Sequence, residues 1–176
     1  MTGPRIPYRP ADIAEPADLV AAIRARRGGT LLHLDRMLLH SAALARAWNA
    51  FLGAIRGDLG VPARLRELVI CAVAAANGAE YELHHHAPLF LRAGGTEAQL
   101  AALRRGIDAG GGPFDETERA VLRLTLEMTQ EVSVRDATFA AVRDLLGEQV
   151  TVELVGVVAA YNMVSRFLVA LEIAPE

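Results

Sequence analysis

Apolar residues recur every three to four positions along most of this chain, which is the spacing of one face of an α-helix. Strict alternation of apolar and polar residues, the pattern of a half-buried strand, is absent. Glycine, proline and helix-capping residues divide the pattern into segments. We therefore predict an all-α protein with about seven to eight helices, in the ranges 18–27, 30–58 with a bend allowed near Ser41, 62–77, 79–94, 96–105, 115–130, 135–146 and 151–171.

Three ionisable residues stand where this pattern calls for apolar side chains. Glu82 and His86 share one helix face with Leu83, Phe90 and other apolar residues, so that face should point inward. Burying a lone charge costs several kcal/mol or more, so such groups must be paired, hydrated or protonated differently from their free forms. Buried groups of this kind indicate a functional site.

Glu67 occupies the middle of the preceding helix, among small and aliphatic residues. The tight connection around Gly78 favours antiparallel packing of the two helices, which would bring Glu67 close to His86. Two interpretations remain open. In one, Glu67 pairs with a neighbouring arginine and Glu82 merely holds a core histidine. In the other, a carboxylate orients an imidazole that transfers a proton near neutral pH, and the catalytic residues are Glu67, Glu82 and His86.

Other candidate residues surround this group. Cys71 lies in an apolar helix with no base beside it in the sequence, a setting in which a thiol is usually inert. Three consecutive histidines, 84–86, cannot face one ion from a regular helix. A metal ion held by Glu67, Glu82 and His86 is geometrically easier, but we predict no metal, which elemental analysis would test. The residues predicted to line the pocket are His40, Cys71, Tyr81 and Phe90.

The composition indicates the broad class of protein. With 176 residues, 52% of them hydrophobic and 5% aromatic, the chain has about the length of one domain and the composition of a helical protein. We divide it into an N-terminal leader with a short helix, 1–29, and a helical domain, 30–176. No apolar run reaches the roughly 18 residues of a membrane span and no signal-peptide core is found, so we expect a cytoplasmic protein without membrane contact.

Charge and missing residue types exclude several functions. The net charge is -3 and the basic residues are scattered among acidic ones, so we expect no nucleic-acid partner. All 18 basic residues are arginine, which excludes Schiff-base chemistry, a covalently held pyridoxal cofactor and a phosphate-loop lysine. A single cysteine excludes a disulfide or a dithiol couple within the chain. We predict chemistry without a cofactor on a small-molecule substrate.

The segments RLRELVICAVAAANGAEYELHHHAPLFLRAG and YNMVSRFLVALEI, at 64–94 and 161–173, resemble the carboxymuconolactone decarboxylase family, which includes the alkylhydroperoxidase D proteins. LLHSAALARAWNAFLGAIR is a weaker upstream match. The resemblance implies the all-helical fold of the alkylhydroperoxidase D type. It also implies a homo-oligomer, a trimer or hexamer, for which the apolar helix at 151–171 could supply an interface.

In the peroxidase branch of this family, the motif is a glutamate, a Cys-x-x-Cys pair and a histidine four residues after the pair. The glutamate and the histidine fall on Glu67 and His86, whereas the cysteine positions fall on Ala79 and Glu82. Peroxide reduction by that mechanism needs both thiols. The resemblance therefore implies the fold and the proton-relay residues without the peroxidase chemistry.

The decarboxylase branch is similar in having Glu-x-x-x-His without thiols, matching Glu82 and His86. Enzymes of that branch work by acid-base chemistry without a cofactor. We therefore predict a lyase or isomerase that acts on a small lactone or carbonyl acid. The alternatives are a non-catalytic member that binds a small molecule, residual redox function of Cys71, and the peroxiredoxin-type activity that the family label carries.

Overall fold

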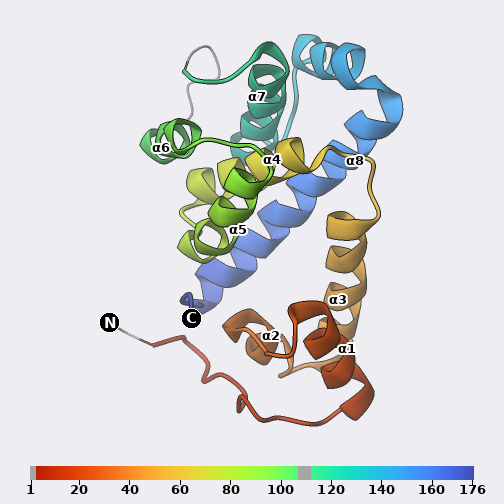
Figure 1. Ribbon diagram of the computed structural model, residues 1–176, viewed down its shortest axis with the longest axis vertical. Helices are drawn as coiled ribbons and strands as arrows, with labels where there is room; N and C mark the ends of the chain where they lie inside the picture. Colours follow the sequence, from red (N-terminus) through yellow and green to blue (C-terminus); the bar gives the residue numbers. More distant parts are fainter. Residues whose placement is uncertain (1–2, 107–111) are drawn as a thin grey trace. The chain divides into compact units, whose positions relative to one another are not determined.

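The computed structural model describes residues 3–106 and 112–176, and its regular elements are the helices α1 to α8 (Figure 1). The all-α prediction is confirmed. The chain forms two compact units. One consists of Met1–Asp58 together with Leu168–Glu176, and the other of Leu59–Phe167. The boundary predicted at residue 29 falls inside the first unit and stays a prediction.

In the first unit, α3 packs against α1 and α2. Its helices are α1 (Ala17–Arg27), α2 (His33–Leu38) and α3 (Ala42–Gly57). The single run predicted over 30–58 is wrong in one respect, because the chain breaks at Ser41 instead of bending. Ser41 has an extended backbone, and its hydroxyl accepts a hydrogen bond from the backbone N–H of Leu44. A serine in this conformation starts a new helix, since it satisfies a donor that the first turn leaves open.

The second unit is built around α4. Its helices are α4 (Ala63–Asn77), α5 (Glu80–Arg92), α6 (Glu97–Arg105), α7 (Glu116–Gln130) and all but the last residues of α8 (Asp136–Leu171). Because α4 packs against α5, α6 and α7, every residue from Glu67 to Ala74 is buried. Residues 68–76 of α4 are apolar on all sides of the helix and belong in a core, so Glu67 is carried into the interior by its neighbours.

Local signals explain where these helices begin and end. Gly78 ends α4 in the left-handed conformation, which glycine adopts without steric cost. Thr96 and Asp115 start α6 and α7 with capping boxes. At Gly147 the backbone leaves the helical region, with φ 79°, which separates the segments predicted at 135–146 and 151–171. The segment 106–114, between the helices predicted at 96–105 and 115–130, lies partly outside the described residues.

Gly95 occupies a position that leaves no room for a side chain. A Cβ atom added there would overlap the ring of Phe90, which is fully buried. We expect Gly95→Ala to lower the free energy of unfolding by about 1–3 kcal/mol, as overpacking in a core does. Urea unfolding of both proteins measures this. Gly53→Ala on α3 is the control, because a Cβ there meets nothing within 4 Å, and equal losses for the two variants would contradict the steric explanation.

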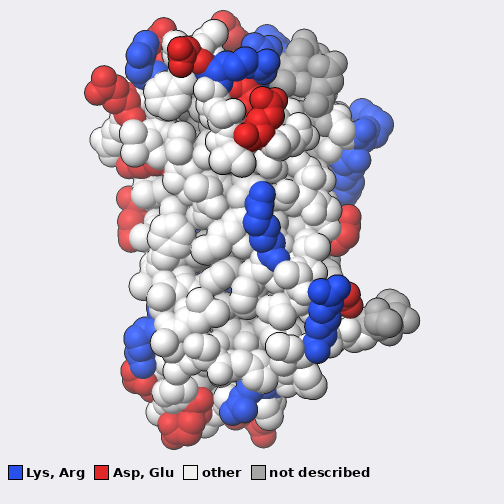
Figure 2. Space-filling model, turned by 180° about the vertical axis from the view of Figure 1, so that it is seen from behind, with Lys and Arg blue, Asp and Glu red and all other residues white. Residues whose placement is uncertain are grey.

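Two surface properties bear on partners and location. On the face shown in Figure 2, acidic and basic side chains lie close to one another, and much of the area between them is uncharged. By length and composition α8 could cross a membrane, with a mean hydropathy of 1.8 in its most apolar window, but core helices of soluble proteins meet the same criterion. The cytoplasmic location and the absence of a nucleic-acid partner stay predictions.

Candidate active site

Glu67 and His86 meet in the interior of the second unit. Glu67 lies on α4 and His86 on α5, and the distance from Glu67 Oε2 to His86 Nδ1 is 2.7 Å. Each residue is only 5% exposed. The proximity predicted from the tight connection at Gly78 is confirmed. The carboxylate that orients the imidazole ring is thus that of Glu67, although the spacing of four residues on α5 favours Glu82 as the partner of His86.

The surroundings of Glu67 favour its ionised form. Burial alone would raise its pKa, but the hydrogen bond and charge of His86, together with Arg66, lower the pKa below the ordinary value of 4.5. An ionised carboxylate only accepts hydrogen bonds, so Nδ1 of His86 must carry a proton. In the neutral imidazole, the lone pair then lies on Nε2. Glu67 therefore sets the tautomer as well as the orientation of His86.

Tyr161 on α8 faces the other side of the imidazole. Its hydroxyl lies 3.3 Å from Nε2 of His86, and the two rings meet edge to face at 5.1 Å. When the imidazole is neutral and Nε2 carries the lone pair, the tyrosine O–H is the donor in this contact. Tyr161 is fully buried. A continuous hydrogen-bonded relay thus connects Glu67, His86 and Tyr161 across three helices.

A second contact joins the same two helices, α5 and α8, one turn away. The hydroxyl of Ser165 donates a hydrogen bond to Oε2 of Glu82, and both residues are buried. Glu82 and His86 are four residues apart on α5, and Ser165 and Tyr161 are four apart on α8, so each pair lies on one face of its helix. The interface therefore carries two polar contacts side by side.

Sequence reasoning missed Tyr161 and Ser165 as site residues. The available signal was their position, because both interrupt the otherwise apolar face of the helix predicted at 151–171. The same argument that selected Glu67 and Glu82 applies to them. A tyrosine or serine hydroxyl is cheaper to bury than a charge, which made the signal weaker.

The structure places the predicted pocket residues in different surroundings. Cys71 is fully buried, and desolvation together with the charge of Glu67 raises its pKa to about 12. Tyr81 packs its ring against His85 at 4.4 Å. Phe90 packs beside Gly95. His40 belongs to the first unit, where its Nε2 contacts the carbonyl oxygen of Pro7 at 2.8 Å.

Among residues 3–106 and 112–176, no group of three or more histidine, cysteine, aspartate or glutamate residues is arranged to hold a metal ion. His84 is exposed, whereas His86 is buried, so the consecutive histidines do not converge. The polar contacts of the site join Glu67 to His86, His86 to Tyr161, and Glu82 to Ser165. Its chemistry is that of a proton relay, in which a fixed carboxylate, an imidazole and a phenol lie in series.

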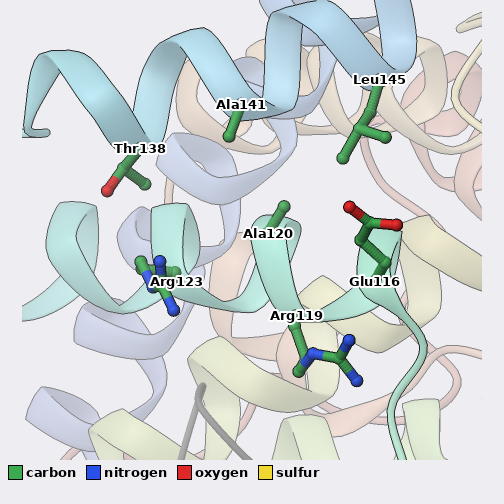
Figure 3. A pocket seen from close by; sticks show the side chains of 7 residues that line it. All are labelled: Glu116, Arg119, Ala120, Arg123, Thr138, Ala141 and Leu145. Carbon is green, nitrogen blue, oxygen red and sulfur yellow. The ribbon is translucent and has the colours of Figure 1, made fainter.

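Two surface cavities lie in the second unit apart from this relay. One is a groove of about 210 Å³ between α7 and α8, in which Ala120 and Ala141 face each other between charged side chains (Figure 3). The other, of about 320 Å³, is bordered by α4, α6 and α7 and includes Arg104 and Arg105. Neither is lined by Glu67, His86 or Tyr161.

Comparisons with solved structures identify the fold. The chain is similar to an alkylhydroperoxidase D core protein, peroxidase-related and uncharacterised, from Ralstonia eutropha JMP134, with a TM-score of 0.83 and 19% identity over 100% of this chain and 94% of that one. A peroxidase-related protein from Silicibacter sp. TM1040 gives a TM-score of 0.82 and 18% identity over 100% and 95%. The debrominase Bmp8, as a variant in complex with 2,3,4-tribromopyrrole, gives a TM-score of 0.78 and 18% identity over 97% of this chain and 92% of that one.

These likenesses establish the alkylhydroperoxidase D-like fold. No curated protein sequence matches the chain. Residues 42–127, which include both Glu67 and His86, match the carboxymuconolactone decarboxylase family. The chain thus combines the alkylhydroperoxidase D-like fold with a segment, residues 42–127, that matches the carboxymuconolactone decarboxylase family.

Proposed function

We propose that this protein is a cofactor-free acid-base lyase or isomerase that acts on a small lactone or carbonyl acid. The observation that carries the proposal is the buried contact of 2.7 Å between Glu67 and Nδ1 of His86. An imidazole held in one tautomer by an ionised carboxylate is a general base with a defined reactive nitrogen. A C–H group next to a carbonyl group is acidic enough for such a base to remove its proton.

In this mechanism Nε2 of His86 takes the proton of the Tyr161 hydroxyl while that oxygen takes a proton from the substrate. The proton returns to the product along the same path, and Glu67 stabilises the imidazolium between the two steps. Tyr161 is the catalytic residue, because its hydroxyl would touch the reacting carbon, and His86 and Glu67 act through it. Because Tyr161 is fully buried, substrate binding must move side chains between α5 and α8.

The test is a proton-exchange assay. A panel of small lactones and keto acids is incubated with the protein in D₂O, and NMR follows deuterium incorporation next to the carbonyl group and loss of CO₂. We expect incorporation with at least one member of the panel and a strong loss in Tyr161→Phe, which keeps the ring and removes the hydroxyl. Exchange that is absent with every compound would contradict the proposal, as would exchange that Tyr161→Phe leaves unchanged.

Peroxide reduction through a thiol is disfavoured by the state of Cys71. With a pKa of about 12, the thiol of Cys71 is protonated at pH 7, whereas the thiolate is the reactive form. We expect any peroxide consumption, with dithiothreitol as reductant, to be the same in the natural protein and in Cys71→Ala. If this variant lost peroxide consumption while its fold stayed intact by circular dichroism, the result would support a redox function of Cys71.

We also propose that copies of the chain associate through the exposed side of α8. Val152 and Met163 are 67% and 40% exposed there, and the space beside Gly156 is open. Exposed apolar side chains along one helix mark an interaction surface. We expect Val152→Glu to shift the sedimentation coefficient of a trimer or hexamer towards that of a monomer. Ala98→Glu on the exposed part of α6 adds the same charge and should change nothing.

A further inference from the structure

The cavity of about 320 Å³ in the second unit has an apolar floor. It is bordered by α4, α6 and α7, each of which contributes residues from near its C-terminal end. The apolar lining residues are two successive alanines of α4 and one leucine each of α6 and α7, namely Ala75, Ala76, Leu103 and Leu126. Among the described lining residues none is aromatic, so the floor offers no ring for stacking and suits an aliphatic group.

The rim of the same cavity is basic. Arg104 and Arg105 of α6 both line it, together with the amide of Gln130 at the end of α7. Within the part of the chain that the structure describes, no aspartate or glutamate lines this cavity. Two guanidinium groups at one cavity repel each other when no carboxylate lies between them. An anion bound there relieves this repulsion and accepts charge-assisted hydrogen bonds.

The end of α6 explains part of this arrangement by itself. Basic side chains in the last turn of a helix interact favourably with the helix dipole, which accounts for arginines at this position. The dipole does not require an apolar cavity beside them. The groove between α7 and α8 provides a comparison, because Glu116 lies among its lining residues together with Arg119 and Arg123. Of these two cavities, the one at α6 therefore combines an apolar floor with charges of a single sign.

This cavity is separate from the relay but lies close to the same helix. Ala75 follows Cys71 by one turn on α4, and Cys71 follows Glu67 by one turn, so the three share one helix face. Desolvation raises the pKa of the Cys71 thiol most strongly, and the positive charge of Arg104 opposes this rise. Arg104 is thus near enough to α4 to act on a buried side chain there. The relay residues themselves do not line the cavity.

We propose that this cavity binds a short aliphatic anion, with its alkyl chain on the floor of alanines and leucines and its charged head between Arg104 and Arg105. The cavity volume lies at the lower end of the range of about 300–1,000 Å³ that is usual for ligand pockets, which limits the ligand to a short chain. The assignment does not depend on the proposed function, because the site lies outside the relay.

The probes are hexanoate, its neutral amide hexanamide, and acetate, which keeps the charge but lacks most of the chain. NMR titration measures their dissociation constants. We expect the natural protein to bind hexanoate at least about tenfold more tightly than either of the others, because charge and buried methylene groups both contribute. The double variant Arg104→Gln, Arg105→Gln should bind hexanoate no better than hexanamide. Ala76→Leu, at an exposed position of the lining, should weaken both six-carbon ligands by occupying their space.

Arg92→Gln is the matched control, because Arg92 is an exposed arginine at the end of α5 that does not line the cavity, and it should keep the affinity for hexanoate. The assignment is overturned if acetate or hexanamide binds as tightly as hexanoate. It is also overturned if the folded double variant keeps the affinity, or if Arg92→Gln weakens binding equally.

Tyr161→Phe separates this site from the relay. Hexanoate should bind this variant as it binds the natural protein, because Tyr161 does not line the cavity. A loss of hexanoate binding in Tyr161→Phe would place the ligand at the relay and overturn the assignment. Hexanoate binding that needs the two arginines, in a protein that exchanges no substrate proton, would support this site and refute the proposed function alone.

Discussion

Replacing His86 with alanine is expected to reduce proton exchange on the substrate by about a hundred- to ten-thousandfold, the usual contribution of a positioned acid or base. His86 connects the carboxylate of Glu67 with the hydroxyl of Tyr161, so its loss leaves Tyr161 without a proton acceptor. Glu67→Gln should give a smaller but clear loss, because an amide can hold the ring without stabilising an imidazolium. The measurement is the rate of deuterium incorporation at saturating substrate.

The control for this prediction is His84→Ala. His84 is a histidine of the same helix, two residues away, but its side chain is exposed. We expect this variant to keep the rate of the natural protein, so that a loss in His86→Ala reflects the relay and not the removal of an imidazole from α5. Unchanged exchange in both His86→Ala and Glu67→Gln would remove the relay from the mechanism.

Glu67→Ala is expected to lower the free energy of unfolding at neutral pH by about 3–5 kcal/mol. The substitution removes the partner of a buried imidazole and of Arg66, and it leaves a cavity in the most buried helix of the unit. Because the buried Nδ1–H of His86 loses its acceptor, the cost exceeds that of a surface ion pair. Urea unfolding followed by circular dichroism measures the loss.

The difference in stability between the natural protein and Glu67→Ala should depend on pH with a defined sign. The pKa of Glu67 is lowered from 4.5 in the folded state, so its ionised form is stabilising above that value. This contribution declines as the pH falls from about 4.5 through the folded pKa, with a slope of at most about 1.4 kcal/mol per pH unit. Taking the difference between the two proteins cancels other carboxylates, such as Glu127, whose pKa is also lowered. A difference that grows on acidification would contradict the assignment of the charge.

The helices themselves were predictable because their signals are local. Gly78, the Thr96 capping box and Asp115 act on backbone groups within a few residues, so their effect is visible in the sequence. Ser41 carries the same kind of signal, yet apolar spacing continues across it, and periodicity alone concealed the break between α2 and α3. A capping residue therefore outweighs an uninterrupted apolar pattern.

The approach of Glu67 to His86 was also predictable, because the two helices that carry them are joined by a short connection. Two helices linked in this way pack side by side, and counting turns from the connection brings the residues to the same level. The partner of Glu82 was not predictable in the same way. His86 lies only four residues from Glu82 in the sequence. Glu82 nevertheless accepts its hydrogen bond from the hydroxyl of Ser165, which lies on α8.

The sequence alone determined the helical class, most helix boundaries, and the burial of three ionisable groups, because these depend on residues within one or two turns of each other. Only the tertiary structure decided which groups complete the site. Tyr161 reaches His86 across 75 positions of sequence, and Ser165 reaches Glu82 across 83. Contacts between distant segments depend on how whole helices pack, which no local pattern encodes.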